Sequence, residues 1–435
     1  MQLPDRMTDM LSMVRSGSIT VKQAQDAQKS KALELNLSLH AAVCFHDAGG
    51  ATYQGALSGV ALAHKDIFDI SGRAPGCGVN GGVVAPKTVP AEVLDLLEQQ
   101  GAMHMASLVM APCAAGATAQ NPHFPACVNP LDSQAAVGGS SSGSAVAVAS
   151  GMSYASLGSD TSGSVRIPAA SCGILGLKTT FGLVSTQGCM PLAPSLDTIG
   201  VLARYAEDAQ CLLQAVLTKD VRSQLVEVNP QQLRLKAWLP SDLDPEVAGV
   251  MVQALDEFGV EVRTDQLHGF NDLSGWANQV LCKEVGLTFS QALQNSIAEP
   301  GVRSLAKFGA SVSDQAYQDA IHQRQKRCAE FLLQNLADAD LLIFPALQVP
   351  LPAWQEVEIG ASSFCKSKFL GMFHYMGFVN YLGLPCLSLP AGRDRAGRPV
   401  AVQVLGRPLM DMALLEWAKS LESVWGKWSQ RFYIH

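Results

Sequence analysis

The chain has 435 residues, of which 48% are hydrophobic and 16% are charged, a composition typical of a globular protein with a large core. Its formal net charge of -7 at pH 7 provides no basic face for phosphate contacts, so nucleic acid is not an expected partner. The N-terminal residues lack the pattern of an export signal, and the apolar runs are interrupted by Gly, Ser, Pro and Asn, so we expect neither secretion nor a membrane span.

The first part of the chain alternates between predicted helices and strands. Residues 20–37 predict a helix with Thr20 as its N-cap. The apolar run V-A-L-A that follows predicts a buried strand with Lys65 at its C-terminal end, which is the end where ligands bind in α/β sheets. Residues 91–100 predict an amphipathic helix that Gly101 terminates, and a strand-like segment follows it at 103–110.

The alternation continues with a predicted helix at 143–151 and a predicted strand at 153–158. The section from 218 to 340 is more charged and mostly helical, with long candidate helices at 272–297 and 312–337, and we expect it to form a lid or cap beside the sheet. Strand signals return in the C-terminal part, before a final helix, at residues 341–345, 386–390 and 400–406. Because no repeat or linker composition divides the chain, one interwoven α/β domain is the simplest organisation.

Two clusters of serine and glycine stand out, at residues 138–144 and 158–164. They lie in or beside a section nearly free of charge, since Asp132 is the one charged residue between Glu98 and Asp160. Glycines let backbone amides approach a ligand, and serines supply hydroxyls that act as nucleophiles or proton relays. The clusters therefore predict a buried site with an oxyanion hole.

Together with Lys65, these clusters make the chain resemble the amidase signature family. The resemblance is dense over residues 55–210 and looser over 375–424, and it also includes Cys172-Gly173, Gly176 to Thr179, Ser195-Leu196-Asp197, Gly200, Asn380, Gly383-Leu384-Pro385, Gln403 and Asp411. It implies an α/β fold with a mixed, largely parallel central sheet covered by helices on both faces. It also implies a single domain over residues 1–435, with a signature core at 55–210 and a variable, mostly helical, substrate-side region at 218–340.

The resemblance implies a catalytic triad in which Ser164 is the nucleophile and Lys65 is the base. Ser140, which follows a cis peptide bond in that family, would relay the proton between them. Physical chemistry supports these roles, because a serine needs a base to remove its proton and a lysine can serve as that base only when it is neutral. Burial in a charge-poor pocket disfavours the ammonium form and so lowers the pKa of a lysine.

The backbone N–H groups of the second cluster are the expected oxyanion hole, which stabilises the charge that develops on the substrate carbonyl; they belong to Thr161, Ser162, Gly163 and Ser164. Gly139, Ser141 and Arg166 are the expected substrate-binding residues, although Arg166 would alternatively anchor the loop. No cofactor or metal is implied, because the nine histidines and eleven cysteines form no H-E-x-x-H or C-x-x-C pattern. Such scattered cysteines are typical of a reducing cytoplasm.

The chain also departs from the family pattern. Residues 111–127 lack the polar stretch with a glutamate that the family usually carries, so we expect one pocket wall to be altered. Ser142 and Ser162 replace glycines that many members have, and a side chain at Ser162 would narrow the acyl site. These changes leave the predicted triad in place, but they do not identify the substrate.

The sequence thus favours a cytoplasmic amidohydrolase that cleaves a small-molecule carboxamide to an acid and ammonia or an amine through an acyl-enzyme on Ser164. Two alternatives remain. Ser141 lies in a G-x-S-x-G motif typical of α/β-hydrolase esterases, with His374 or His435 as the base, but the residues before it make a poor strand. A catalytically idle homologue would instead bind an amide or serve within a complex. The sequence does not determine the oligomeric state, and a homodimer is one of the possibilities.

Overall fold

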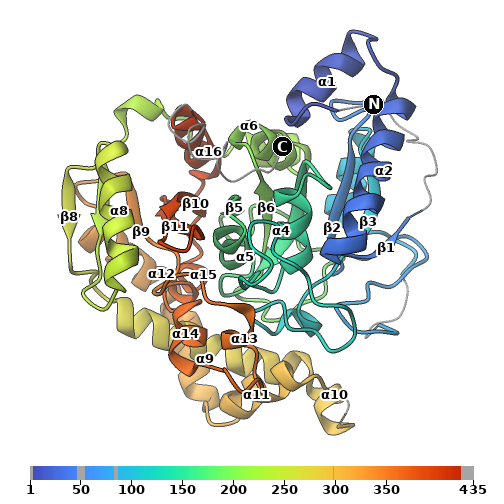
Figure 1. Ribbon diagram of the computed structural model, residues 1–435. Coiled ribbons are helices and arrows are strands. Elements are labelled where there is room, and N and C mark those ends of the chain that lie inside the picture. Colours follow the sequence, from blue (N-terminus) through green and yellow to red (C-terminus); the bar gives the residue numbers. More distant parts are fainter. Residues whose placement is uncertain (1–2, 47–53, 83–86, 297, 423–435) are drawn as a thin grey trace.

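The computed structural model describes residues 3–46, 54–82, 87–296 and 298–422 (Figure 1). Within them, eight strands form the larger sheet in the order β4-β6-β5-β10-β11-β9-β7-β8. Their bounds are β4 Ala155–Asp160, β5 Leu175–Lys178, β6 Thr198–Ala203, β7 Leu235–Trp238, β8 Val262–Thr264, β9 Leu341–Pro345, β10 Cys386–Arg393 and β11 Pro399–Leu405. Every residue of β9 and β11 is buried, so both faces of the sheet are covered there.

A smaller sheet of three strands lies beside the large one, in the order β1-β3-β2, with bounds β1 Ala42–Phe45, β2 Ala61–Lys65 and β3 Met103–Leu108. β2 pairs with β3 in parallel and packs against β4 of the larger sheet. All five residues of β2 are buried. The C-terminal end of β2, which carries Lys65, therefore lies at the junction of the two sheets.

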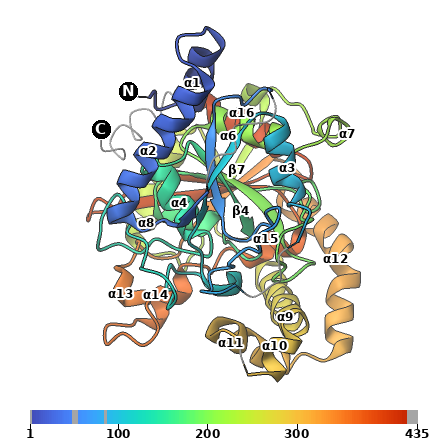
Figure 2. The ribbon, with the colours of Figure 1, turned by 90° about the vertical axis from the view of Figure 1, so that its right-hand side faces the viewer.

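Helices surround the sheets (Figures 1 and 2). α5 packs on β5, β10 and β11, α8 packs on β10 and β11, and α6 packs on β4, β6 and α16. The helices are α1 Met7–Arg15, α2 Val21–Leu39, α3 Glu92–Gln99, α4 Ser142–Ala149, α5 Arg166–Ser171, α6 Ala206–Ala215, α7 Lys219–Arg222, α8 Pro245–Glu257, α9 Phe270–Thr288, α10 Ser290–Gln294, α11 Pro300–Gly309, α12 Asp314–Asn335, α13 Trp354–Val357, α14 Lys366–Gly371, α15 Gly377–Leu382 and α16 Asp411–Ser420, with short 3₁₀ turns at Pro112–Ala114 and Pro230–Gln232.

The α/β architecture and the mixed sheet are confirmed, but the expectation of a largely parallel sheet is wrong. Among the described strands of the large sheet, the five pairings from β4 through to β9 are antiparallel and the two that join β9, β7 and β8 are parallel. The connection between β10 and β11 is a short turn, which suits antiparallel neighbours. β7 and β8 are joined through α8, the longer crossover that parallel pairing requires.

Most of the elements predicted in the first part of the chain are confirmed. Thr20 caps α2 with the reciprocal bonds of a capping box, in which its hydroxyl and the side chain of Gln23 each accept a backbone N–H. Gly101 ends the segment after α3 with a φ of 85°. The section 218–340 contains the expected long helices, but it is not wholly helical, because β7 and β8 extend the large sheet.

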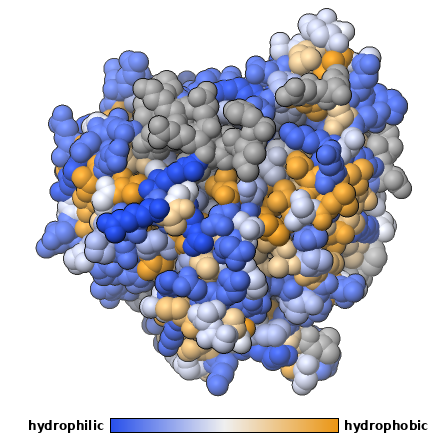
Figure 3. Space-filling model, viewed as in Figure 1, coloured by the Kyte–Doolittle hydropathy of each residue, from blue (hydrophilic) through white to orange (hydrophobic). Residues whose placement is uncertain are grey.

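The face of the molecule drawn in Figure 3 is mostly polar, with apolar residues gathered in places. In that view they are dense beside α2 and the three-stranded sheet. On α2 the side chains of Leu33 and Leu37 are exposed to 45% and 81%. In the part of the chain that the structure describes, no helix combines the length and the apolar character needed to cross a membrane.

Candidate active site

Lys65 and Ser140 meet at the junction of the two sheets. Lys65 ends β2 and is 1% exposed. Its Nζ donates hydrogen bonds to Ser140 Oγ at 2.7 Å and to Ser159 Oγ, on β4, at 2.8 Å. The Gly139–Ser140 peptide bond is cis, as the resemblance implies. Two residues that are 75 positions apart in the sequence are thus in direct contact, as a base and a proton relay require.

The surroundings of Lys65 favour its neutral form. Burial lowers the pKa of Lys65 to about 8, and nearby Cys189 and Asp160 offset part of that effect. A lysine with this pKa is partly neutral near physiological pH, so it is able to accept a proton. Burial thus favours the neutral amine, which is the form that the predicted role as a base requires.

Backbone contacts hold the loop that carries Ser140. The Ser140 carbonyl accepts the N–H of Ala111 at 3.1 Å, and the N–H of Ser141 donates to the Ser164 carbonyl at 3.1 Å. Gly139 packs so tightly against the Thr118 carbonyl oxygen that a Cβ would overlap it. The hydrogen bond between Ser141 and Ser164 brings the two serine clusters side by side.

Ser164 follows β4 and precedes α5, and it is 8% exposed. Its loop turns at Gly163, which has a φ of 105° and packs against Met376, so a side chain there would be both strained and crowded. In the described part of the chain no hydrogen bond joins the Ser140 and Ser164 hydroxyls. The link from Ser140 to Ser164 therefore stays a prediction.

The expected oxyanion hole needs one correction. The N–H of Gly163 donates to Asp160 Oδ1 at 2.8 Å. Because this N–H already has an acceptor within the loop, it is not available to bind the oxygen of a substrate. Asp160 Oδ2 also accepts the N–H of Val165 at 3.2 Å. The backbone N–H groups of Thr161, Ser162 and Ser164 remain the predicted donors.

Arg166 is not placed to bind substrate, which corrects one of the two roles considered for it. Its side chain is fully buried and forms an ion pair with Asp160 at 3.0 Å. Its guanidinium also donates to Gln403 Oε1 and Asn380 Oδ1, both at 2.6 Å. Burial alone would raise the pKa of Asp160, but the charge and hydrogen bonds of Arg166 outweigh burial and lower it. Arg166 thus anchors the loop that carries Ser164.

Several site residues were not found by reasoning from the residue pattern. Ser159 contacts Lys65 through its hydroxyl, and the one available signal was its place beside Asp160 in the second serine cluster. Asn380 and Gln403 were included in the resemblance without a role. They hold Arg166 from segments more than 200 residues away, at separations of 214 and 237 residues, which no local pattern reveals.

The geometry does not support the esterase alternative. Ser141 is fully buried, and its Oγ donates to the Ser159 carbonyl at 3.4 Å. The residues before it form turns and extended chain rather than the strand that a nucleophile elbow needs. His374 lies 3.3 Å from Asp242 in a separate cluster, and His435 lies outside the described residues.

The segment 111–127, which departs from the family pattern, lies against the Ser140 loop. It contributes the contacts of Ala111 with Ser140 and of Thr118 with Gly139. Its His123 side chain also meets Glu299, just before α11, at 3.1 Å. The segment therefore connects the Ser140 loop to the helical region.

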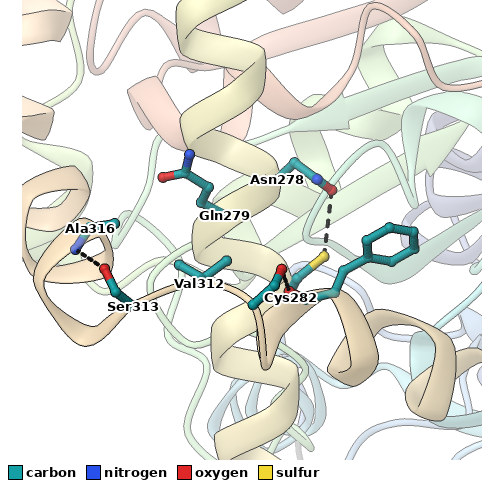
Figure 4. Close-up of a pocket in the computed structure, with 8 residues that line it drawn as sticks. Asn278, Gln279, Cys282, Val312, Ser313 and Ala316 are labelled. Carbon is teal, nitrogen blue, oxygen red and sulfur yellow. Dashed lines mark hydrogen bonds between the residues drawn. The ribbon is translucent and has the colours of Figure 1, made fainter.

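A separate cavity of about 350 Å³ lies between α9, α11 and the start of α12 (Figure 4). Asn278, Gln279, Cys282, Val312, Ser313 and Ala316 are among the residues that line it. None of the predicted site residues does so. Within the described ranges, no three His, Cys, Asp or Glu side chains converge as metal ligands.

Comparison with known proteins identifies the family. A family model described as Amidase matches residues 32–259 and 231–415. The chain is 32% identical to the A subunit of the glutamyl-tRNA(Gln) amidotransferase of Chromohalobacter salexigens over 83% of this chain and 82% of the relative. It is 29% identical to the corresponding protein of Wolinella succinogenes over 94% of this chain and 99% of the relative.

Solved structures agree. A crystal structure described as an amidase superposes with a TM-score of 0.85 at 26% identity, covering 96% of this chain and 99% of the other. A 6-aminohexanoate cyclic dimer hydrolase shares the fold, with a TM-score of 0.85 at 22% identity over 97% of this chain and 98% of the other. With the Lys65–Ser140 contact and the two serine loops in place, these matches show that the chain belongs to the amidase signature family, whose enzymes act on amide C–N bonds.

Proposed function

We propose that this enzyme hydrolyses a small-molecule carboxamide to a carboxylic acid and ammonia or an amine through an acyl-enzyme on Ser164. The observation that carries the proposal is the 2.7 Å contact between Lys65 Nζ and Ser140 Oγ in a buried site. That contact supplies a base and a proton relay next to the loop of a third residue, Ser164, whose hydroxyl is suited to nucleophilic attack.

In the acylation step, Ser164 Oγ attacks the amide carbonyl carbon and its proton moves to Ser140, whose own proton moves to neutral Lys65. The carbonyl electron pair moves onto oxygen, where the backbone N–H groups of Thr161, Ser162 and Ser164 stabilise it. Collapse of this intermediate breaks the C–N bond, and the leaving nitrogen takes a proton back through Ser140. Water then cleaves the ester by the same relay and releases the acid.

The test is ammonia release from a panel of aliphatic, aromatic, malonamate-like and ureido amides. The wild-type enzyme should release ammonia from at least one class, and the Ser164→Ala variant should release none. Release that persists in Ser164→Ala would contradict the proposal. The Ser141→Ala variant should retain turnover, since the Ser141 hydroxyl donates to the Ser159 carbonyl and takes no part in the proposed proton transfers.

The relatives favour a second candidate, in which this chain is one component of a glutamyl-tRNA(Gln) amidotransferase. The net charge of -7 weighs against contact with tRNA, so the small-molecule proposal is preferred. Ammonia release from L-glutamine that depends on Ser164 and rises when tRNA and the other components are added would favour the second candidate. Release from small amides by the chain alone would favour the first.

We also propose a cytoplasmic location, because the eleven cysteines are all free in the structure, as is typical of a reducing compartment. Recovery of the enzyme in the cytoplasmic fraction, with its thiols reduced, is the expected result of cell fractionation.

For the organisation of the chain, we infer that residues 55–210 supply the catalytic groups and that residues 218–340 lie on the substrate side.

A further inference from the structure

The loop at residues 192–197 is hydrogen-bonded to Thr161, which belongs to the predicted oxyanion hole. The Thr161 hydroxyl donates to Asp197 Oδ1 at 2.6 Å. Asp197 Oδ2 accepts the backbone N–H of Leu192 at 2.9 Å. Asp197 thus joins this loop to Thr161, whose backbone N–H is one of the predicted oxyanion donors.

Two helices of the region 218–340 hold the other end of that loop. Glu284 on α9 is 4% exposed, and its Oε2 accepts the backbone N–H of Ser195 at 2.9 Å. Its Oε1 accepts the hydroxyl of Tyr317, on α12, at 2.8 Å. Arg324, also on α12, donates to the Ser195 carbonyl at 2.6 Å. Both backbone polar groups of Ser195 are therefore fixed by side chains of the helical region.

A second chain of hydrogen bonds leads from α12 to the loop that carries Ser164. The Arg324 guanidinium donates to the Asn380 carbonyl at 3.1 Å and lies 4.3 Å from the ring centre of Phe181. Asn380 in turn donates through its side chain to the Asp160 carbonyl at 2.9 Å. Since Asp160 immediately precedes Thr161, both chains of hydrogen bonds end at the same turn of the backbone.

The presence of a buried carboxylate at this place is costly for folding. Burying a charge costs free energy unless hydrogen bonds or an opposite charge compensate for it, and here both Glu284 oxygens accept hydrogen bonds and Arg324 lies near enough to interact with the carboxylate. A second buried carboxylate lies close by: burial raises the pKa of Asp197 to about 6, and repulsion from Glu284 adds to that effect. Groups with perturbed pKa values cluster at functional sites.

We propose that Glu284 is a positioning residue, which holds Ser195 and, through Asp197, sets the position of the Thr161 backbone N–H in the oxyanion hole. This inference rests on the proposed function, since it assumes that Ser164 attacks and that Thr161 stabilises the oxyanion. It gives the helical region the role of a fixed support for catalysis, in addition to any contact with substrate.

The test is inactivation of the full-length enzyme by a fluorophosphonate, whose P=O group occupies the oxyanion hole when Ser164 is phosphonylated. The saturation kinetics give a maximal rate, kinact, and a half-saturation concentration, KI. Glu284→Gln is the main variant and Tyr317→Phe, which removes one of the two hydrogen bonds to Glu284, is the milder one. Glu330→Gln is the matched control, because Glu330 lies on α12 in exposed ion pairs with Lys326 and Arg327.

The expected result is a kinact for Glu284→Gln that is lower by about tenfold, with KI unchanged, because a small misplacement of a catalytic group lowers the chemical step without weakening binding. Glu330→Gln should keep the wild-type kinact. A merely structural role would lower the melting temperature and leave kinact, measured well below melting, at the wild-type value. That result would overturn the inference.

Two further outcomes are decisive. If Glu284→Gln does not fold, Tyr317→Phe decides, since a lowered kinact supports the inference and a wild-type kinact overturns it. If wild-type Ser164 is not labelled at all, the proposed function itself fails and the inference fails with it. The two failures are therefore distinguishable, because only the second one removes labelling from the wild-type enzyme.

Discussion

The pKa of Lys65 makes a direct prediction about the pH dependence of activity. Burial lowers this pKa from an ordinary 10.5 to about 8. Below pH 8 the residue is mostly an ammonium ion, which has no lone pair to accept the proton from Ser140. Activity should therefore be lost as the pH falls through 8 and reach a plateau above it.

The size of the effect follows from the titration of a single group. With a pKa near 8, about one lysine in eleven is neutral at pH 7 and about ten in eleven at pH 9. The kcat/KM should thus rise about tenfold between pH 7 and pH 9, because this ratio reports ionisations of the free enzyme. A lysine left at its ordinary pKa would give a rate that is still rising at pH 10.

The assay is initial rate against pH with a neutral amide, or the rate of phosphonylation of Ser164 if no substrate is in hand. A second buried lysine needs a control, because burial lowers the pKa of Lys178 to about 7. The variant Lys178→Met should keep the inflection near pH 8, and Lys65→Met should lose activity at every pH. A wild-type profile that is flat or falls between pH 7 and pH 9 would refute the role of Lys65 as base.

Three substitutions test the support of the site. Arg166→Met should lower the free energy of unfolding by about 3–5 kcal/mol in chemical denaturation, because it leaves Asp160 buried without its cation, and a loss below about 1 kcal/mol would count against that reasoning. Ser159→Ala removes one of the two hydroxyls that hold Lys65 Nζ, so kcat/KM should fall on the order of tenfold in initial-rate assays, and an unchanged value would show that Ser140 alone positions the lysine. Gly139→Ala places a methyl group on the Thr118 carbonyl and should cost about 1–3 kcal/mol of stability, which a wild-type melting temperature would disprove.

The local features of the site were predictable because they depend on neighbouring residues. The buried run before Lys65 predicted β2 and placed the lysine at its end, which is where it lies. The serine and glycine clusters predicted a buried site, and the structure shows both clusters beside Lys65, with a hydrogen bond between their backbones. These signals are short-range, so the amino-acid pattern carries them directly.

Features that depend on distant partners were not predictable in the same way. Strand direction in the large sheet follows from how segments pair across the whole chain, so the expectation of mostly parallel pairing failed. β7 and β8 were missed because they are short and lie in a charged, mainly helical section. The role of Arg166 is set by Asn380 and Gln403, whose proximity only the folded chain creates.

The most direct test of the central claim is to identify the residue that a fluorophosphonate modifies. Intact-mass and peptide mass spectrometry should find one adduct on Ser164 in the wild-type enzyme and none in Ser164→Ala, and Lys65→Met should label far more slowly, because its serine lacks a base. An adduct on Ser141, or labelling of Lys65→Met at the wild-type rate, would contradict the Lys65–Ser140–Ser164 mechanism.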